Sequence, residues 1–252
     1  MIILLVMFIL GILLGFVGAG GAGVVIALLT TLFNVPIHMA LGTSLAAMAC
    51  TTFSGAYSHF REGNIVIRLG FSIGIFGAVG SFLGAKISSL LAADLLHFLT
   101  AIMLFSSSLL IYFKVFYLKP IKLAKDYTSY SRTKFWILAI FFGIFNGLLS
   151  GIFGVGATPF IQLTLLFIFG TTLFQSVGTT MLIILPIAIT GGIGYLTSGL
   201  LDLTLFLQVV TGLITGAYIG AKFTRKLPLI VLRITMVIIP LVGAIMLILD
   251  QL

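Results

Sequence analysis

The chain has 252 residues, of which 61% are hydrophobic and only 7% are charged. Soluble domains carry about a quarter charged residues, so this chain cannot cover itself with polar surface, and we expect an integral membrane protein. Its net charge of +8 does not indicate nucleic-acid binding, because six of the thirteen cations stand together in one polar stretch. The single cysteine, Cys50, excludes an internal disulfide and any paired-cysteine metal site.

Apolar runs, and the polar or glycine-rich breaks between them, predict ten helices and no strand. A membrane span needs roughly 20 apolar residues, and an all-α polytopic membrane protein is the fold class that fits these runs. The N-terminal run lacks the positive start of a signal peptide, and the apolar chain resumes after it, so we assign it to the mature fold. The predicted helices are 2–16, 22–33, 38–57, 65–90, 95–116, 135–149, 159–169, 174–196, 203–224 and 229–249.

One polar stretch divides the chain into two hydrophobic parts. Clustered lysine and arginine are typical of a cytoplasmic loop beside anionic lipid. We therefore predict a first transmembrane repeat at 1–113, a basic cytoplasmic linker at 114–134 and a second transmembrane repeat at 135–252. The cations of this stretch are Lys114, Lys119, Lys122, Lys125, Arg132 and Lys134.

The two parts repeat each other at a fixed offset of 136 residues. "GLLSGIFGVG" at 147–156 has the glycine spacing of "GILLGFVGAG" at 11–20, and "GTT" at 178–180 follows "GTS" at 42–44. Nine glycines coincide at this offset, where glycine frequency alone would give roughly 1.5, so internal duplication is the better interpretation.

The glycine-rich stretches predict a broken helix at the start of each repeat. The two segments around each stretch have about 12 to 16 residues, or roughly 18 to 24 Å at 1.5 Å per residue, which is short for a span. We expect a re-entrant pair of half-helices followed by three transmembrane helices, and this odd number of crossings makes the repeats inverted. Four full spans in each half would instead make them parallel, and the positive-inside rule favours inversion.

A break inside hydrocarbon indicates a cavity, because freed backbone groups must be buried in protein or line a water-filled space. Glycines there let a small oxyanion approach backbone N–H groups and the positive end of a half-helix. The alternative is close helix packing, which we prefer for "GAVGSFLG" at 77–84. The candidate substrate-binding glycines are Gly18, Gly20, Gly21, Gly154 and Gly156.

Adjacent hydroxyls form a second candidate group in "LGTSL" and its counterpart "VGTTM". Thr43, Ser44, Thr179 and Thr180 can donate to an anion without placing charge in the membrane. The alternative is that each hydroxyl bonds to a carbonyl of its own helix.

Further polar residues have ordinary explanations at this stage. We interpret His59 as a loop histidine, and the repeated Lys86 and Lys222 as cations that reach toward the interface. Asn146 and Gln162 lie in apolar surroundings of the second repeat alone, so any site is expected to be asymmetric.

At these residues the chain resembles the sulfite exporter TauE/SafE family of membrane permeases. The motifs that carry the resemblance are "GFVGAGGAG", "HMALGTSLAA", "SGAYSHFREGNI" and "GSFLGAKI", with weaker counterparts in "GIFGVGATPFI" and "SVGTTM". The resemblance implies an inner-membrane transporter of small sulfur-containing anions, such as sulfite or organosulfonates, without ATP or a cofactor. Family members commonly have a third consecutive glycine and then a proline, where this chain has Ala22 and Ala157-Thr158.

Two other functions were weighed against a carrier, whose partners would be the anion and the lipid bilayer, with a homo-oligomer left open. A passive anion channel would show rings of cations or a continuous polar stripe, and the chain shows isolated polar spots instead. An intramembrane hydrolase would need a serine and a base within hydrogen-bond reach, but Ser54 and His59 are five residues apart and lie off one helix face.

Overall fold

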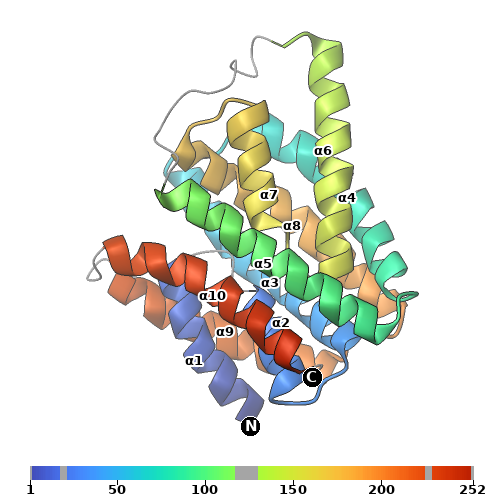
Figure 1. The fold of residues 1–252 in the computed structure, drawn as a ribbon. Helices are drawn as coiled ribbons and strands as arrows, with labels where there is room; N and C mark the ends of the chain where they lie inside the picture. Colours follow the sequence, from blue (N-terminus) through green and yellow to red (C-terminus); the bar gives the residue numbers. More distant parts are fainter. Residues whose placement is uncertain (1, 18–21, 117–129, 225–228, 251–252) are drawn as a thin grey trace.

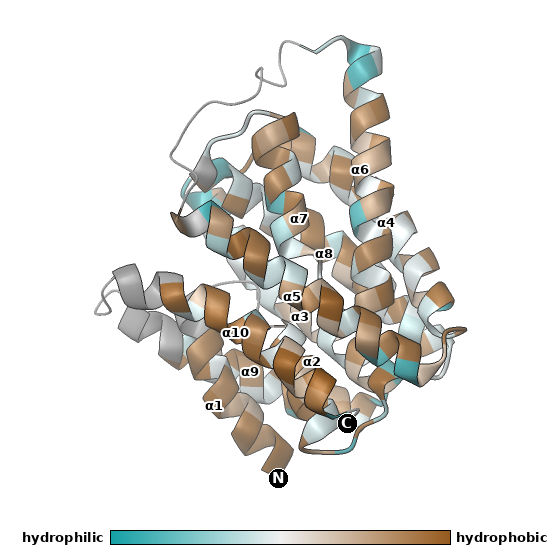
Figure 2. Ribbon diagram, viewed as in Figure 1, coloured by the Kyte–Doolittle hydropathy of each residue, from teal (hydrophilic) through white to brown (hydrophobic). Residues whose placement is uncertain are grey.

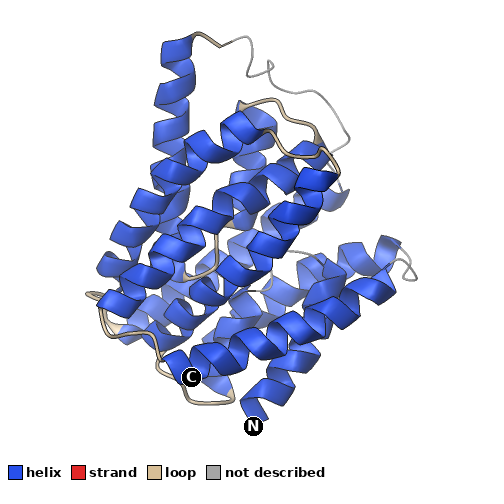
Figure 3. Ribbon diagram, turned by 180° about the vertical axis from the view of Figure 1, so that it is seen from behind, coloured by secondary structure: helices blue, strands red, loops and turns tan. Residues whose placement is uncertain are grey.

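The structure is a computed structural model that describes residues 2–17, 22–116, 130–224 and 229–250. Helices make up nearly all of this part of the chain, and it contains no strand (Figure 3). The predicted all-α class is therefore confirmed. In chain order the elements are α1 (Ile2–Val17), α2 (Ala22–Thr31), α3 (Ile37–Arg61), α4 (Ile67–Ser88), α5 (Ala93–Phe116), α6 (Arg132–Phe153), α7 (Thr158–Leu163), the π-helix η2 (Thr164–Ile168), α8 (Leu173–Thr197), α9 (Leu203–Thr224) and α10 (Leu229–Leu249).

Short polar side chains set several helix starts, as sequence chemistry dictates. The Ser131 hydroxyl accepts from the backbone N–H of Lys134 at the start of α6, and Thr172 forms a capping box with Gln175 at the start of α8. Glycine ends two helices: Gly63 after α3 and Gly199 after α8 both have φ of 71°, a left-handed conformation that side chains disfavour.

The outer surface is strongly apolar, as expected of a protein solvated by lipid. Large hydrophobic side chains such as Phe53, Phe71 and Phe141 are more than half exposed, and brown apolar residues cover the outer helices in Figure 2. Four of the described helices, α4, α5, α6 and α8, are long and apolar enough to cross a bilayer. Such a surface would not be stable in water, so the membrane assignment stands.

Glycine seams join helices that are far apart in the chain. Helix α6 packs along α4, and α1 packs along α9 (Figure 1). A Cβ on Gly84 would lie 2.6 Å from the Leu148 carbonyl oxygen, and one on Gly80 would overlap the Ile144 oxygen. The packing interpretation of the glycines at 77–84 is therefore confirmed, because only glycine permits this backbone approach.

The same contacts recur between α1 and α9 at the offset of 136 residues. Gly216 meets the Phe8 carbonyl oxygen as Gly80 meets that of Ile144. Likewise Gly11 meets the Leu213 oxygen as Gly147 meets that of Gly77. The opening helix of each half therefore packs against the fourth helix of the other half, so the halves interlock.

Helices α3 and α8 form a central antiparallel pair. Leu45 lies against Gly191 near one end, and Met181 lies against Gly55 near the other. Gly42 contacts Tyr195 and Gly178 contacts His59, which continues the same antiparallel register outward. The pair fixes the relative height of every residue that borders the break between α6 and α7.

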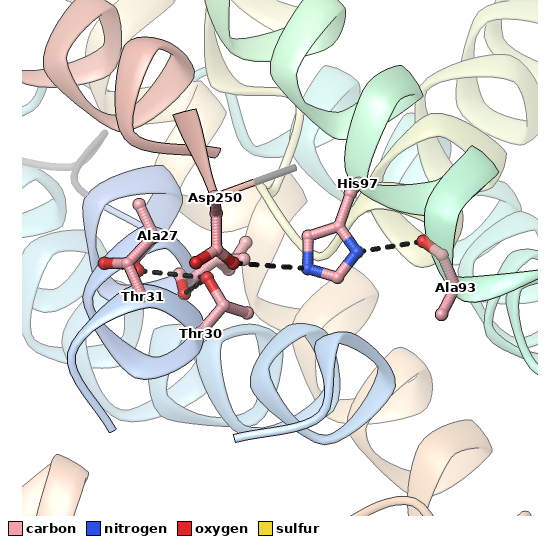
Figure 4. Close-up of polar contacts among 7 residues, drawn as sticks. Ala27, Thr30, Thr31, Ala93, His97 and Asp250 are labelled. Atoms are coloured by element: carbon pink, nitrogen blue, oxygen red, sulfur yellow. Dashed lines mark hydrogen bonds and ion pairs between the residues drawn. The ribbon is translucent and has the colours of Figure 1, made fainter. Parts of the chain in front are cut away.

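Helices α5 and α10 close one side of the molecule. His97 Nε2, near the start of α5, lies 3.9 Å from the Asp250 carboxylate, just after α10. Figure 4 shows this pair beside Thr30 and Thr31 at the end of α2, whose hydroxyls donate to the Ala27 carbonyl. The contact ties three helix ends together at the surface, away from the break.

One predicted length is wrong. The sequence pattern ends the sixth helix at residue 149, but α6 has 22 residues and continues to Phe153. Gly147 and Gly151 do not break it, because they pack against the backbone of Gly77 and Ser81 and are held there in helical conformation. Helix α6 is therefore long enough to span, and only α7 with η2 is short.

Candidate functional site

The break between α6 and α7 consists of four buried residues in unusual backbone conformations. Gly154, Gly156 and Ala157 have φ of 64°, 74° and 46°, and all four residues from 154 to 157 are buried. The Gly154 N–H still bonds to the Ser150 carbonyl at 2.9 Å, which ends α6, and Ala157 begins the next helix by accepting from Ile161. Consecutive left-handed residues therefore reverse the chain inside the protein.

Gly156 lies at mid-height between the two central helices. A Cβ there would overlap the Met48 side chain of α3 and would lie 3.8 Å from Ile184 Cγ2 of α8. Met48 is 11 residues from the start of α3 and 13 from its end, and Ile184 has the same position in α8. The backbone at Gly156 is thus close to the centre of the helical layer.

The chain returns from the break toward the end at which α6 began. The Tyr130 hydroxyl, two residues before α6, donates to the Ile168 carbonyl at the end of η2 at 2.6 Å. Helix α7 and η2 have six and five residues, together roughly 16 Å at 1.5 Å per residue, about half of a bilayer core. This short second arm agrees with the predicted half-helix.

The second arm changes to π conformation directly after α7. The Phe169 N–H bonds to the Thr164 carbonyl, five residues earlier, at 3.3 Å. π-Helical turns are rare and occur frequently at functional sites. The irregular backbone of this arm therefore covers both its beginning and its end.

One face of α3 borders both helix breaks. Leu41 packs against Gly154 and Met48 against Gly156, while the Ser44 hydroxyl donates to the Ala22 carbonyl, the first residue of α2, at 3.0 Å. Residues 41, 44 and 48 share a helix face because their spacings are three and four. The structure thus brings Ser44, Gly154 and Gly156 together along this face.

The four candidate hydroxyls do not form one cluster. Thr43 and Ser44 lie near the start of α3, whereas Thr179 and Thr180 lie near the start of the antiparallel α8, about 20 Å away along the helix pair. Thr179 accepts from the Val66 N–H at 3.0 Å, and Thr180 donates back to the Ser176 carbonyl at 2.6 Å. The candidates Gly18, Gly20 and Gly21 lie outside the described residues.

Several buried polar atoms around the break have no hydrogen-bond partner among the described residues. They include the hydroxyls of Thr43, Ser150 and Thr158 and the Oδ1 atom of Asn146. Thr43 and Ser150 are fully buried, and Thr158 is 4% exposed. Buried polar groups are normally paired, because an unpaired one costs free energy. These groups are therefore candidates to bind a polar solute. Sequence analysis missed Ser150 and Thr158, whose only signal was their nearness to the glycines.

A further contact was not predicted from the sequence. Lys114 Nζ, near the end of α5, donates to Gln162 Oε1 on α7. Sequence analysis assigned Lys114 to the polar linker, but the structure turns its side chain toward the broken helix. Gln162 itself was noted as an isolated polar residue, and the lysine explains it.

Comparison with known proteins agrees with this arrangement. Residues 3–247 match the sulfite exporter TauE/SafE family. The chain belongs to the TauE/SafE family. The probable membrane transporter protein YdhB of Bacillus subtilis is 53% identical over 98% of this chain and 99% of YdhB. The B. subtilis probable membrane transporter protein YunE is 28% identical over 93% and 94%, and one from Xylella fastidiosa is 25% identical over 86% and 81%. No solved structure matches the chain significantly.

The TauE/SafE family and these relatives are described as membrane transporters, so the protein is a transporter and not an enzyme. The geometry gives no support to the hydrolase alternative. Ser54 is exposed on the outer surface of α3, and His59 Nδ1 lies 3.5 Å from Glu62. Within the described residues no hydrogen bond joins Ser54 to His59.

One departure from the common TauE/SafE pattern falls on a strained residue. Ala157 has φ of 46° and is fully buried. An L-residue in this conformation costs about 1 to 2 kcal/mol, which glycine avoids. This chain therefore maintains the reversal at the break although alanine disfavours it.

Proposed function

We propose that this TauE/SafE transporter is a secondary carrier that moves small sulfur-containing anions, such as sulfite or organosulfonates, across the inner membrane. Transport would proceed by alternating access around a mid-membrane site at the broken helices. The observation that carries the proposal is the position of Gly156, buried between the midpoints of α3 and α8 at the start of a short helix. Broken helices at mid-membrane are where repeat-built secondary transporters bind substrates.

The chemistry of the break suits an oxyanion. Gly154 and Gly156 have no side chain to shield the backbone, and the helix Thr158–Ile168 begins directly after them. Backbone N–H groups at a helix start attract anions. The unpartnered hydroxyl of Thr43 would add a donor without a charge, and Ser44 would hold the opposite break through Ala22. From the sequence repeat alone, we assign the same role to Gly18, Gly20 and Gly21 with Thr179 and Thr180.

Alternating access by inverted repeats is supported by paired contacts. A two-fold axis in the membrane plane makes equivalent helices antiparallel, and α3 and α8 are antiparallel. Under the offset of 136, the contact of Leu45 with Gly191 becomes that of Met181 with Gly55. The contact of Gly42 with Tyr195 becomes that of Gly178 with His59. We therefore infer that residues 1–113 and 135–252 are inverted repeats.

The orientation follows from the same proposal. The basic linker would face the cytoplasm, because Lys and Arg are concentrated on that side of membrane proteins. The functional unit, whether one chain or a homo-oligomer, binds one small anion at each break.

The test is substrate profiling in proteoliposomes with purified protein. Sulfite, thiosulfate, sulfate and sulfoacetate are compared with and without a pH gradient, and counterflow of labelled substrate distinguishes a carrier from a channel. We expect saturable sulfite or sulfonate flux with counterflow. The Gly156→Leu variant should lose this flux, whereas Gly63→Leu should keep it, because a Cβ on Gly63 would meet nothing within 4 Å. Absence of flux for all four anions would refute the proposal.

A further inference from the structure

Lys114 is a cation turned into the protein without an acidic partner. Its Nζ donates to Gln162 Oε1, and no carboxylate of the described residues lies within ion-pair distance of it. The acidic side chains that the structure describes, Glu62, Asp94, Asp202 and Asp250, are all exposed. A cation in apolar surroundings is costly unless it is paired, so this ammonium favours binding of a mobile anion.

The lysine is connected to the break by a line of polar groups along α7. Gln162 and Thr158 are four residues apart and therefore lie on the same helix face. Gln162 is 9% exposed, and the Thr158 hydroxyl is 4% exposed and has no partner. Thr158 follows Gly156 by two residues. The polar line therefore runs from Lys114 through Gln162 and Thr158 to Gly156.

The other described cations have different surroundings. Lys134 is exposed and lies over the Tyr130 ring, with Nζ 4.7 Å from its centroid, and Arg68 is exposed over Phe135. Lys86 donates to the Ser198 hydroxyl at the end of α8. Of these four cations, only Lys114 contacts the short arm Thr158–Ile168 that carries the break.

We propose that Lys114, with Gln162 and Thr158, forms an oxyanion-binding step between the linker end of the molecule and the break at Gly156. The proposal rests on the proposed function and names the residue that selects for negative charge. The ammonium attracts the oxyanion, Gln162 holds the ammonium in the absence of the anion, and Thr158 offers a hydroxyl donor on the way to Gly156. The anion is the transported substrate and not a lipid phosphate.

The decisive variants change charge in opposite ways. Lys114→Gln removes the cation, and Gln162→Glu keeps it but supplies an internal carboxylate that competes with the substrate. Both should raise the KM for sulfite at least tenfold in proteoliposomes, whereas Lys114→Arg should retain most of the affinity. If Lys114 only fastened α5 to α7, Gln162→Glu would strengthen that contact and leave the KM unchanged. Lys134→Gln is the matched control, because it removes an exposed cation near the same end of the molecule, and its KM should equal that of the wild type.

Two further arms separate the possible causes. Thermal unfolding in detergent with increasing sulfite should show stabilisation of the wild type and of Lys134→Gln, and none of Lys114→Gln or Gln162→Glu. This arm does not depend on flux, so it tests the site even if the proposed transport fails. Vesicles of phosphatidylcholine alone are compared with vesicles containing phosphatidylglycerol. A loss of wild-type flux in phosphatidylcholine that Lys114→Gln does not share would assign the lysine to lipid phosphate and overturn the proposal. Unchanged KM and unchanged sulfite stabilisation in both Lys114→Gln and Gln162→Glu would also overturn it.

Discussion

Met48 and Ile184 border the same glycine from two different helices, and they are 136 residues apart in the sequence. The offset is the one that relates the two halves of the chain, and each residue stands at the midpoint of its own helix. The break at Gly156 therefore lies beside the centre of the α3–α8 pair. A substrate at this point would be equally distant from both ends of the pair, as alternating access requires.

Thr43 provides a test that separates binding from folding. Thr43→Val removes a fully buried hydroxyl that has no partner in the described structure, so the stability of the protein should be unchanged or slightly higher. If the hydroxyl binds the anion, the KM for sulfite should rise several-fold in proteoliposomes. Thermal unfolding in detergent, measured in parallel, shows that folding is intact.

The control for this variant is another buried threonine of α3. The Thr52 hydroxyl donates to the Met48 carbonyl at 2.6 Å, so Thr52→Val loses a hydrogen bond within its own helix. It should lower stability slightly and leave the KM unchanged. An unaltered KM for Thr43→Val would remove this hydroxyl from the binding site.

The backbone at the break should tolerate no side chain. Gly154→Ala combines a left-handed conformation with a clash, because the new Cβ would lie 2.8 Å from the Leu41 Cα and carbonyl oxygen. Gly63→Ala meets the same conformational cost of about 1 kcal/mol without any clash. We expect the unfolding temperature to fall clearly more for Gly154→Ala than for Gly63→Ala. Equal decreases would mean that the Leu41 backbone moves aside freely.

The two glycine seams should respond alike if the halves are repeats. Gly80→Ala and Gly216→Ala each place a Cβ on a carbonyl oxygen, that of Ile144 and that of Phe8. Both should destabilise the protein by similar amounts. Gly55→Ala should have a smaller effect, because its nearest neighbour is the flexible Met181 side chain at 3.2 Å. Thermal unfolding of the three variants checks this order, and a silent Gly216→Ala would contradict equivalent packing.

Tyr195 should stabilise the end of α6. Its fully buried hydroxyl lies 2.8 Å from the Gly151 carbonyl and 2.9 Å from Ser88 Oγ. Tyr195→Phe leaves both groups without this partner and should cost about 1 to 3 kcal/mol. The exposed Tyr57 of α3 is the matched control, and Tyr57→Phe should be near neutral in the same unfolding measurement. A neutral Tyr195→Phe would show that another group replaces the hydroxyl.

The sequence by itself determined the class of the protein and the places of its breaks. A chain with so few charges can only fold in lipid, and lipid permits helices because every backbone group must be satisfied within the chain. The glycines at 154 and 156 were predicted to end a helix, and they do so because their positive φ is open to glycine at no steric cost. The repeat was also visible, since identical spacing survives in the sequence.

Only the tertiary structure decided which glycines pack and which break the chain. Gly147 and Gly154 look alike in the sequence, but Gly147 faces the backbone of α4 and stays helical, while Gly154 lies against Leu41 and turns the chain. It also decided that Lys114 belongs to α7 and not to the linker surface, because a long flexible side chain points where its helix end is placed. Such contacts join residues distant in sequence, and no local pattern of residues specifies them.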